Sequence, residues 1–358
     1  MDRKKRIVIA DIHSKNENGK CTGHFFFFAE NYKNALEKDY NVVVAGGPVY
    51  KQRFSEDCLL TLPFDYVVGD SKLFNTIRSL CNAFVLFRKV EDGDIVIMQQ
   101  ARPVTSFVGI LFFCNSKCRL FSVQYSKHFL SKKIFRLIYN LTKKYIRGIL
   151  CPNEEVGKAY DLPYLVMPDY IYVDKMYDDC NVSYEDKEFD FCVVGRLNKD
   201  KGIIEVAKYF RNKKYKLLIA GNVEDKSYGD EMSLVCNDCN NITLKIGYLS
   251  DNEYNSYIRR SRYSILNYQS EYSQRSSGVV YDFIFNDVPI IGRKCGAFDF
   301  VCRNNLGSVY EDMNSYDWAS LFDATIYGYY LESIRKYKLT HIQVIYNLEK
   351  FLEKKESL

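Results

Sequence analysis

The stretch FDFCVVGRLNKDKG, residues 189–202, carries the pattern on which the fold assignment depends. Its apolar first half predicts a buried strand, and a helical pattern follows its last residue. Gly195 permits a tight turn after the strand, and Gly202 lets the chain enter the helix closely. Arg196 and Lys201 place two cations on this strand–loop–helix junction. Because a helix N-terminus adds its own partial positive charge, the junction suits a diphosphate, with an ordinary polar loop as the alternative.

Short apolar segments alternate with helical patterns on both sides of that stretch. Continuous apolar strands bounded by Gly, Asp or Asn fit a parallel sheet that is covered on both faces. In the N-terminal half we expect strands at 5–13, 40–47, 94–100 and 118–125, with helices at 24–38, 71–88, 104–113 and 130–149. In the C-terminal half we expect strands at 189–197, 215–222, 242–249, 262–268, 288–294 and 306–311. The pattern predicts an α/β fold with two Rossmann-like domains.

The alternation lapses over residues 163–188, which are polar, acidic and without a clear period, and which we interpret as the interdomain linker. We therefore expect a Rossmann-like domain over 1–168 and a second over 187–338, with a C-terminal helix at about 339–358 that packs back on the first domain. Ligands of open α/β sheets bind at the carboxyl ends of the strands. Two such domains facing each other across a cleft predict a ligand in that cleft.

Composition and charge exclude several classes of protein. The chain has 358 residues, of which 47% are apolar and 27% charged, so it is globular and long enough for two domains. A net charge of +5, dispersed among acids, does not indicate a nucleic-acid partner. The apolar stretch 104–114 is too short to span a bilayer, and residues 7–10 form a first strand rather than a signal peptide. We expect a cytoplasmic protein whose twelve cysteines are reduced.

A second informative stretch is QRSSGVVYDFIFNDVPII, residues 274–291, in which a polar cluster precedes an amphipathic helix and an apolar strand. Ser276 and Ser277 are suited to cap the helix, and Gly278 lets a ligand approach the backbone. Pro289 begins the next strand, where a missing N–H group is tolerated. We expect the N–H groups at this helix start to face an anion.

Taken together, these segments resemble the GT-B glycosyltransferases, in particular the large retaining group called family 4. GRLNKDKG resembles the donor-phosphate loop of that family, and QRSSGVVYDFIFNDVPII resembles its signature of a polar loop, a helix carrying an acid, and a strand that begins at proline. IAGN (219–222) and ITLKIGYLSDNEYNSYIRRSRYSIL keep the family's order, and ILCPNEEVGKAY resembles the strand and short helix that close its N-terminal half. The likeness covers most of 189–300 well and the N-terminal half in outline. It implies the GT-B architecture and a nucleotide-diphosphate sugar as donor.

The resemblance also implies roles for individual residues. The expected catalytic residues are Arg196, Lys201, Gln274 and Asp282, and the expected donor-binding residues are Gly195, Tyr248, Leu249, Glu271, Ser276, Ser277 and Gly278. The family's signature is Glu, seven residues, Glu, whereas this chain has Gln274 and Asp282 at those positions. Asp282 can still accept hydrogen bonds from a ribose, Gln274 can bond a sugar hydroxyl without carrying charge, and Glu271 is an alternative acid. This departure bears on sugar specificity more than on the fold.

We expect the N-terminal half to supply the acceptor site. The loop at 16–24 carries Gly19 and Gly23, whose flexibility allows close backbone approach to a ligand. In the family, a histidine on an N-domain loop lies near the reacting sugar; here Gln124 stands at the expected place, with His128 four residues on and a structural role as its alternative. The expected acceptor-contacting residues are Gly23, His24, Gln99, Arg102, Gln124 and His128.

Residues 131–150, SKKIFRLIYNLTKKYIRGIL, form a basic amphipathic pattern. The apolar residues that a helix would place on one face are Ile134, Leu137, Ile138, Leu141, Tyr145 and Ile146. Such a helix either packs on the core with a solvated basic face or lies on an anionic membrane surface. Both hold together if the acceptor is a lipid-linked sugar.

The expected function is that of a hexosyltransferase (EC 2.4) that moves a sugar from a nucleotide-diphosphate sugar, with UDP as the favoured base, to a glycan or lipid-linked acceptor in bacterial surface polysaccharide biosynthesis. Arg196 and Lys201 would stabilise the leaving diphosphate. Since no Asp-x-Asp follows a strand of the donor half, and Cys236 and Cys239 form an isolated C-x-x-C, we expect no metal and no cofactor. The resemblance implies retention of the anomeric configuration.

Two alternatives remain open at this point. A nucleotide-sugar epimerase shares the two-domain fold but usually needs ionisable groups around the sugar, which the Gln at 274 does not supply. A degenerate, non-catalytic transferase acting as a binding partner is compatible with both departures from the signature. In every case we expect a location in the cytoplasm or at the inner face of the membrane, and no nucleic acid as partner.

Overall fold

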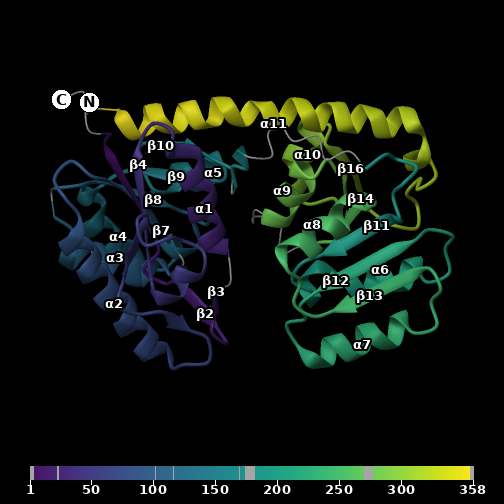
Figure 1. Ribbon diagram of the computed structural model, residues 1–358, viewed down its shortest axis with the longest axis horizontal. Coiled ribbons are helices and arrows are strands. Elements are labelled where there is room, and N and C mark those ends of the chain that lie inside the picture. Colours follow the sequence, from purple (N-terminus) through teal and green to yellow (C-terminus); the bar gives the residue numbers. More distant parts are fainter. Residues whose placement is uncertain are drawn as a thin grey trace. The chain divides into compact units, whose positions relative to one another are not determined.

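The computed structural model describes residues 4–21, 24–100, 102–115, 117–168, 170–173, 182–269 and 277–354. The chain divides into two compact units. Unit 1 consists of residues 1–173 and 342–358, and unit 2 consists of residues 174–341. In Figure 1 each unit is a sheet flanked by helices.

The sheet of unit 1 has seven parallel strands in the order β10-β9-β8-β7-β1-β4-β5. The strands are β1 (Arg6–Ala10), β4 (Asn41–Gly46), β5 (Leu59–Thr61), β7 (Ile95–Gln99), β8 (Arg119–Val123), β9 (Ile146–Cys151) and β10 (Tyr164–Val166). β1 lies between β4 and β7 and pairs with both, and Ala10 of β1 is opposite Met98 of β7. Both central strands are almost entirely buried because helices cover both faces of the sheet, as their continuous apolar sequence indicates.

The helices of unit 1 begin where the chain offers recognisable start signals. Ser71 caps α2 by accepting a hydrogen bond from the N–H of Phe74, and Pro103 occupies the first turn of α3. The α-helices are α1 (His24–Leu36), α2 (Lys72–Lys89), α3 (Pro103–Phe113), α4 (Lys133–Thr142) and α5 (Glu154–Ala159), and the short 3-10 helices are η1 (Pro48–Gln52), η2 (His128–Ser131) and η3 (Lys143–Tyr145). In the outer layer α2 packs against α3, and α3 packs against α4.

Two expectations for unit 1 were wrong in detail. The helix expected over 130–149 ends at Thr142, because the chain turns through η3 and enters strand β9 at Ile146, which pairs with β8. The loop expected at 16–24 instead begins with a hairpin. Its strands β2 (Lys15–Glu17) and β3 (Lys20–Cys21) are joined by Asn18 and Gly19, both with positive φ, and β2 also pairs with β6 (Tyr66–Val67).

The sheet of unit 2 has six parallel strands in the order β13-β12-β11-β14-β15-β16. They are β11 (Phe189–Val194), β12 (Leu217–Gly221), β13 (Ile242–Ile246), β14 (Ser261–Leu266), β15 (Ile290–Arg293) and β16 (Gly307–Tyr310). The flanking helices are α6 (Ile203–Phe210), α7 (Lys226–Cys236), α8 (Asp251–Arg259), α9 (Gly278–Phe285) and α10 (Asp299–Arg303), with the 3-10 helices η5 (Lys199–Lys201), η7 (Gly296–Phe298) and η8 (Ser320–Phe322). Every residue of β11 is buried, so the loop that follows this strand is anchored in the core of unit 2.

The last helix, α11, runs from Ala324 to Glu353 and contributes to both units. It begins well before the C-terminal helix that we expected at about 339. In unit 2 the buried Lys338 of α11 donates to both carboxylate oxygens of Asp287, at 3.0 and 3.2 Å. In unit 1 the ring of Phe351 lies 5.5 Å from that of Phe121 on β8. Each half of α11 is therefore held by its own unit.

Candidate functional site

The loop between β11 and α6 has the conformation that a close backbone approach requires. Gly195 follows β11 with φ 101°, and Gly202 precedes α6 with φ 57°, both in the left-handed region that side chains disfavour. Helix α6 begins at Ile203, which confirms the helix start expected from the sequence. The loop lies at the carboxyl edge of the sheet, where open α/β sheets bind their ligands.

Arg196 is held at the surface of this loop by an acid from the neighbouring strand. Its Nη2 lies 2.9 Å from Oε1 of Glu224, a residue that follows β12, and 57% of its side chain is exposed. Asn198 donates to the other carboxylate oxygen of Glu224 at 3.1 Å. Glu224 was not among the expected site residues. It holds one nitrogen of the guanidinium and leaves the other N–H donors of Arg196 exposed.

Lys201 is the unusual residue of the site. It is 8% exposed, and no carboxylate of the described residues forms an ion pair with its ammonium group. Burial, and next the positive charge of Arg196, lower the pKa of Lys201 to about 8, while Asp282 and Glu224 act in the opposite direction. A buried cation without a counter-ion is costly, and such groups mark functional sites more often than structural ones.

The chain segment after β14 closes around the loop. Asn267 donates to the carbonyl of Gly202 at 3.0 Å, and the N–H of Gln269 donates to the carbonyl of Asp200 at 2.9 Å. Arg293, at the end of β15, donates to Oε1 of Gln269 at 2.8 Å. These residues were missed at the sequence level, although each stands at a strand end, which is the signal that could have identified them. They fix the loop from the side opposite to Glu224.

Helix α9 meets the same loop. Ser277 is its N-cap residue and Gly278 its first residue, as expected, but the Ser277 hydroxyl lies 2.7 Å from Tyr268 Oη and makes no capping bond to the helix. A Cβ atom on Gly195 would lie 3.5 Å from Val279 in the first turn of α9. The helix N-terminus is therefore packed beside the loop that carries the two cations.

Asp282, on the second turn of α9, accepts a hydrogen bond at 2.8 Å from the hydroxyl of Tyr254 on α8. Tyr254 was not among the expected site residues. Tyr248 and Leu249 follow β13 on the same edge of the sheet, and the Tyr248 side chain is exposed. Four expected site residues lie outside the described residues: Gly23, Glu271, Gln274 and Ser276.

Unit 1 has a separate group of buried polar side chains at the carboxyl edge of its own sheet. His13 lies after β1, Gln99 ends the neighbouring strand β7, and Gln100 follows it. Within the described residues, both ring nitrogens of His13 and both amide atoms of Gln100 lack a hydrogen-bond partner, as does Oε1 of Gln99. Because buried polar groups are normally satisfied, such a cluster indicates a place where a ligand supplies the missing bonds. His13 and Gln100 were not among the expected acceptor residues.

The pKa values of His13 and of the nearby Asp11 are both shifted by burial. Burial, and then the positive charge of Arg102, lower the pKa of His13 to about 3, so its ring is neutral near pH 7. Burial raises the pKa of Asp11 to about 6, against hydrogen bonds donated by the Tyr50 hydroxyl and the His13 N–H. Neutral imidazole and amide groups suit a ligand that both donates and accepts hydrogen bonds, such as a hydroxyl-rich one.

The other expected acceptor residues lie in different settings. Nδ1 of His24 lies 2.8 Å from the hydroxyl of Tyr170, and Arg102 stacks on the ring of Tyr66 with its Cζ 4.5 Å from the ring centre. Gln124 is buried, bonds Ser122 Oγ at 2.8 Å, and accepts from the Tyr160 hydroxyl at 2.8 Å. His128 is exposed in η2. This geometry favours a structural role for Gln124.

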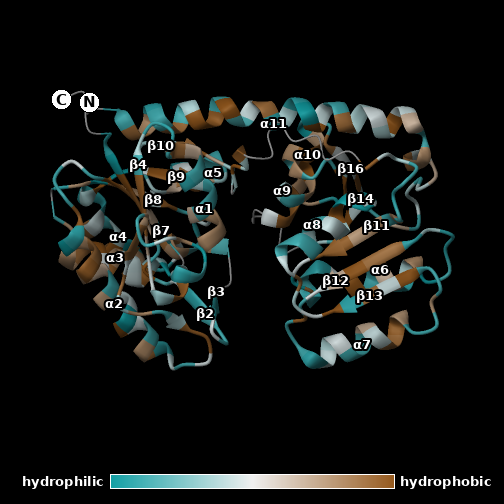
Figure 2. Cartoon of the chain, in the orientation of Figure 1, coloured by the Kyte–Doolittle hydropathy of each residue, from teal (hydrophilic) through white to brown (hydrophobic). Residues whose placement is uncertain are grey.

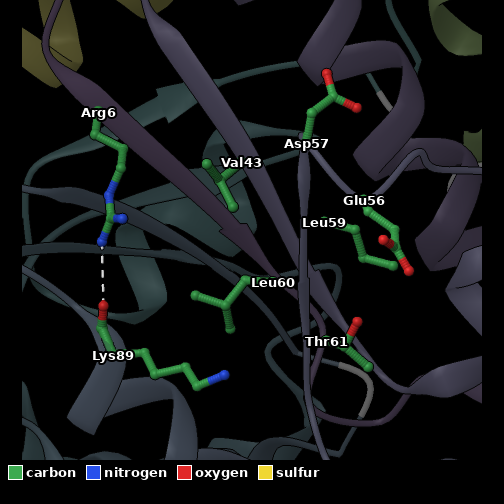
Figure 3. Close-up of a pocket in the computed structure, with 8 residues that line it drawn as sticks. All are labelled: Arg6, Val43, Glu56, Asp57, Leu59, Leu60, Thr61 and Lys89. Carbon is green, nitrogen blue, oxygen red and sulfur yellow. Dashed lines mark hydrogen bonds between the residues drawn. The ribbon is translucent and has the colours of Figure 1, made fainter.

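A pocket on the surface of unit 1 lies apart from both groups (Figure 3). It is lined by Arg6, Val43, Glu56, Asp57, Leu59, Leu60, Thr61 and Lys89. Its guanidinium, that of Arg6, is already paired with Asp94 and Glu91 and donates to the carbonyl of Lys89 at 3.1 Å. The pocket contains none of the expected site residues, and we assign no ligand to it.

No group of three or more His, Cys, Asp or Glu side chains in the described part of the chain is placed to hold a metal ion. Among the helices described, none combines the length and apolar character needed to cross a bilayer.

Comparison with known proteins gives a fold but no close relative. No protein-family model and no curated protein sequence matches the chain. A glycosyltransferase from Rickettsia africae is 14% identical and matches 99% of this chain and 100% of its own, with a TM-score of 0.69. HepE of Anabaena, solved with UDP-glucose, is 11% identical over 96% of this chain and 99% of its own, with a TM-score of 0.64. TarM is 15% identical over 77% of this chain, with a TM-score of 0.59, and the chain spans 58% of TarM's length. The two parallel sheets and these matches together show that the chain has the GT-B fold, which confirms the architecture expected from the sequence.

Proposed function

We propose that the protein is a glycosyltransferase that moves a hexosyl group from a nucleotide-diphosphate sugar to a glycan or lipid-linked acceptor. The observation that carries the proposal is the buried Lys201, without a carboxylate partner among the described residues, on a loop that also holds Arg196 and touches the first turn of α9. Two cations and a helix N-terminus together form a site for a diphosphate.

In this proposal the residues of unit 2 act on the leaving group. The bond between the anomeric carbon and the phosphate oxygen breaks, and negative charge collects on the departing nucleoside diphosphate. Lys201 and Arg196 stabilise that charge, which is the role a divalent metal plays in other transferases, so turnover is expected to need no metal. Gln274, Asp282 and Glu271 are the proposed contacts to the sugar and ribose. Retention of configuration is proposed from the resemblance to family 4.

The base of the donor is proposed to be uracil. HepE, which shares the fold, was solved with UDP-glucose. In this chain Tyr248 and Leu249 are the proposed base contacts, because they follow β13 at the edge of the sheet that carries the phosphate loop.

The acceptor is proposed to bind unit 1. His13, Gln99 and Gln100 each have buried polar atoms that no other described residue bonds, which supports this placement, and their neutral character suits sugar hydroxyls. His24 and Arg102 are proposed at the margin of the same site. A lipid-linked acceptor in bacterial surface polysaccharide biosynthesis would bring the basic segment 131–150 to the inner face of the cytoplasmic membrane.

The direct test is turnover of UDP-glucose and related sugar nucleotides, with and without EDTA, on a mixture of polyisoprenyl-linked and soluble oligosaccharide acceptors. The proposal expects release of the nucleoside diphosphate that survives EDTA and is lost in Arg196→Ala and Lys201→Ala. Lys199→Ala is the matched control, because Lys199 is an exposed cation of the same loop.

Other outcomes would assign a different function. Interconversion of the donor sugar without an acceptor would identify an epimerase. Donor binding without turnover on any acceptor would identify a binding protein, an alternative that the Gln274 and Asp282 departures from the family signature keep open. Turnover abolished by EDTA would contradict the metal-free mechanism.

A further inference from the structure

The outer layer of unit 1 exposes large apolar side chains on three neighbouring helices, α2, α3 and α4, and Figure 2 shows apolar residues along their ribbons. Phe112 on α3 is 72% exposed and Leu73 on α2 is 68% exposed. Phe74 and Ile77 on α2 are also exposed. Groups of exposed apolar side chains on neighbouring elements of a soluble protein mark interaction sites more often than isolated ones do. We call this surface the α2–α3–α4 face.

Helix α4 shows that this exposure is not a by-product of core packing. Its buried residues Tyr139 and Thr142 already hold it to unit 1. Ile134, Leu137 and Leu141 are 64%, 58% and 51% exposed and share one side of the helix at i, i+3 and i+7. The core therefore does not account for these three aliphatic side chains. The expectation that one apolar side of the segment packs on the core holds for Ile138, Tyr145 and Ile146 and not for these three.

The charges of the same three helices are all of one sign. Helix α2 contains Lys72, Arg78, Arg88 and Lys89, helix α4 contains Lys133 and Arg136, and α3 contains no charged residue. None of the three helices contains Asp or Glu, in a chain that has 45 acidic residues against 50 basic ones. The carboxylate of Asp70, just before α2, pairs with Arg78, and the three helices themselves contribute only cations. An apolar surface edged by such cations is complementary to an anionic layer with an apolar interior.

We propose that the α2–α3–α4 face docks unit 1 on the surface of an anionic phospholipid bilayer. A protein partner fits less well, because protein interfaces are depleted in lysine, whereas lysines at a bilayer surface reach the phosphate groups while aliphatic and aromatic side chains enter the headgroup region. The inference rests on the proposed function in one respect, since a lipid-linked acceptor would give the docking its purpose. It extends the expected membrane contact from residues 131–150 to three helices.

The test is co-sedimentation of the purified full-length protein with vesicles, without donor or acceptor. One set contains phosphatidylglycerol and phosphatidylcholine in equal parts, and the other contains phosphatidylcholine alone. We expect binding to the anionic vesicles only, weakened by salt. Phe112→Glu combined with Leu137→Glu should reduce the affinity for anionic vesicles by roughly tenfold or more, because two apolar side chains that enter the bilayer become anions. Lys72→Gln combined with Lys133→Gln should reduce it by about fivefold for each cation removed.

Leu234→Glu is the matched control, because Leu234 lies on α7 of unit 2 and is 74% exposed. All variants concern exposed side chains, and circular dichroism and thermal unfolding establish that they fold. No binding to anionic vesicles, or equal loss in Leu234→Glu, would overturn the proposal. Self-association of the protein without vesicle binding, lost in the same variants, would assign the face to a second copy and also overturn it. Because no sugar is present, failure of the transferase proposal and failure of membrane docking are separable.

Discussion

Replacing Lys201 by methionine should stabilise the protein while it abolishes binding of the donor. Methionine keeps most of the side-chain volume but removes the buried charge. Burial is the main reason that the pKa of Lys201 falls from 10.5 to about 8. Since each tenfold change in proton affinity is worth about 1.4 kcal/mol, the charged form costs the folded state about 3 kcal/mol. We therefore expect Lys201→Met to raise the free energy of unfolding by up to about 3 kcal/mol at pH 7.

The pH dependence of stability provides an independent test of the stabilisation expected for Lys201→Met. Below pH 8 the ammonium is protonated in both the folded and the unfolded chain, so the whole penalty acts on the folded state. Between pH 8 and 10.5 the unfolded chain binds more protons than the folded one, and stability rises with pH. The advantage of Lys201→Met over the wild type should therefore shrink through this window and vanish above it.

The assay is urea unfolding of wild type, Lys201→Met and Lys199→Met at several pH values between 7 and 10.5, followed by fluorescence. Lys199 is exposed in the same loop, so its replacement should change little at any pH. A Lys201→Met protein that is less stable than wild type at pH 7 would refute the reasoning. So would a stability difference that does not change with pH.

Two further predictions concern packing in unit 2. Gly202→Ala should lower the free energy of unfolding, measured in urea, by about 3 kcal/mol, because its φ is 57° and a Cβ atom would lie 2.6 Å from the carbonyl oxygen of Asn267. The control is Gly93→Ala, which should cost only about 1 kcal/mol because Gly93 has φ 86° and nothing within 4 Å of a Cβ atom. Equal losses in the two variants would contradict the steric argument. Lys338→Met should cost about 3 kcal/mol by the same measurement, because it removes the buried cation bound to Asp287; a loss below about 1 kcal/mol would show that the pair does not hold α11.

The elements that local pattern determines could be predicted from the sequence, and those that depend on neighbours could not. The run FDFCVV is apolar throughout because β11 is buried on both faces, so its strand and the following helix start were recognisable. The end of α4 was not, since the apolar period continues through the segment that becomes β9. The hairpin at Asn18 and Gly19 carried a known turn signal, but it was interpreted as a flexible loop.

The candidate site shows the same division. Arg196 and Lys201 stand in one short motif and could be identified there. Glu224 and Gln269 reach the loop from β12 and β14, and only the strand order β12-β11-β14 brings them together. The carboxylates that act on the pKa of Lys201, those of Asp282 and Glu224, likewise come from elements distant in sequence. His13 stands at a strand end, but only the folded unit reveals that its ring nitrogens have no hydrogen-bond partner in the described part of the chain.

The most direct test of the central claim, that the 195–202 loop binds the donor diphosphate, is a calorimetric titration of the protein with UDP at pH 7 and pH 9. We predict one binding site, with proton uptake at pH 9 because the bound diphosphate restores the charge of Lys201. The affinity for UDP should fall by roughly tenfold or more in Lys201→Met and in Arg196→Ala. Lys199→Met should bind as the wild type does. Absence of binding by UDP, GDP and CMP to well-folded protein, or undiminished UDP binding by Lys201→Met, would contradict the account.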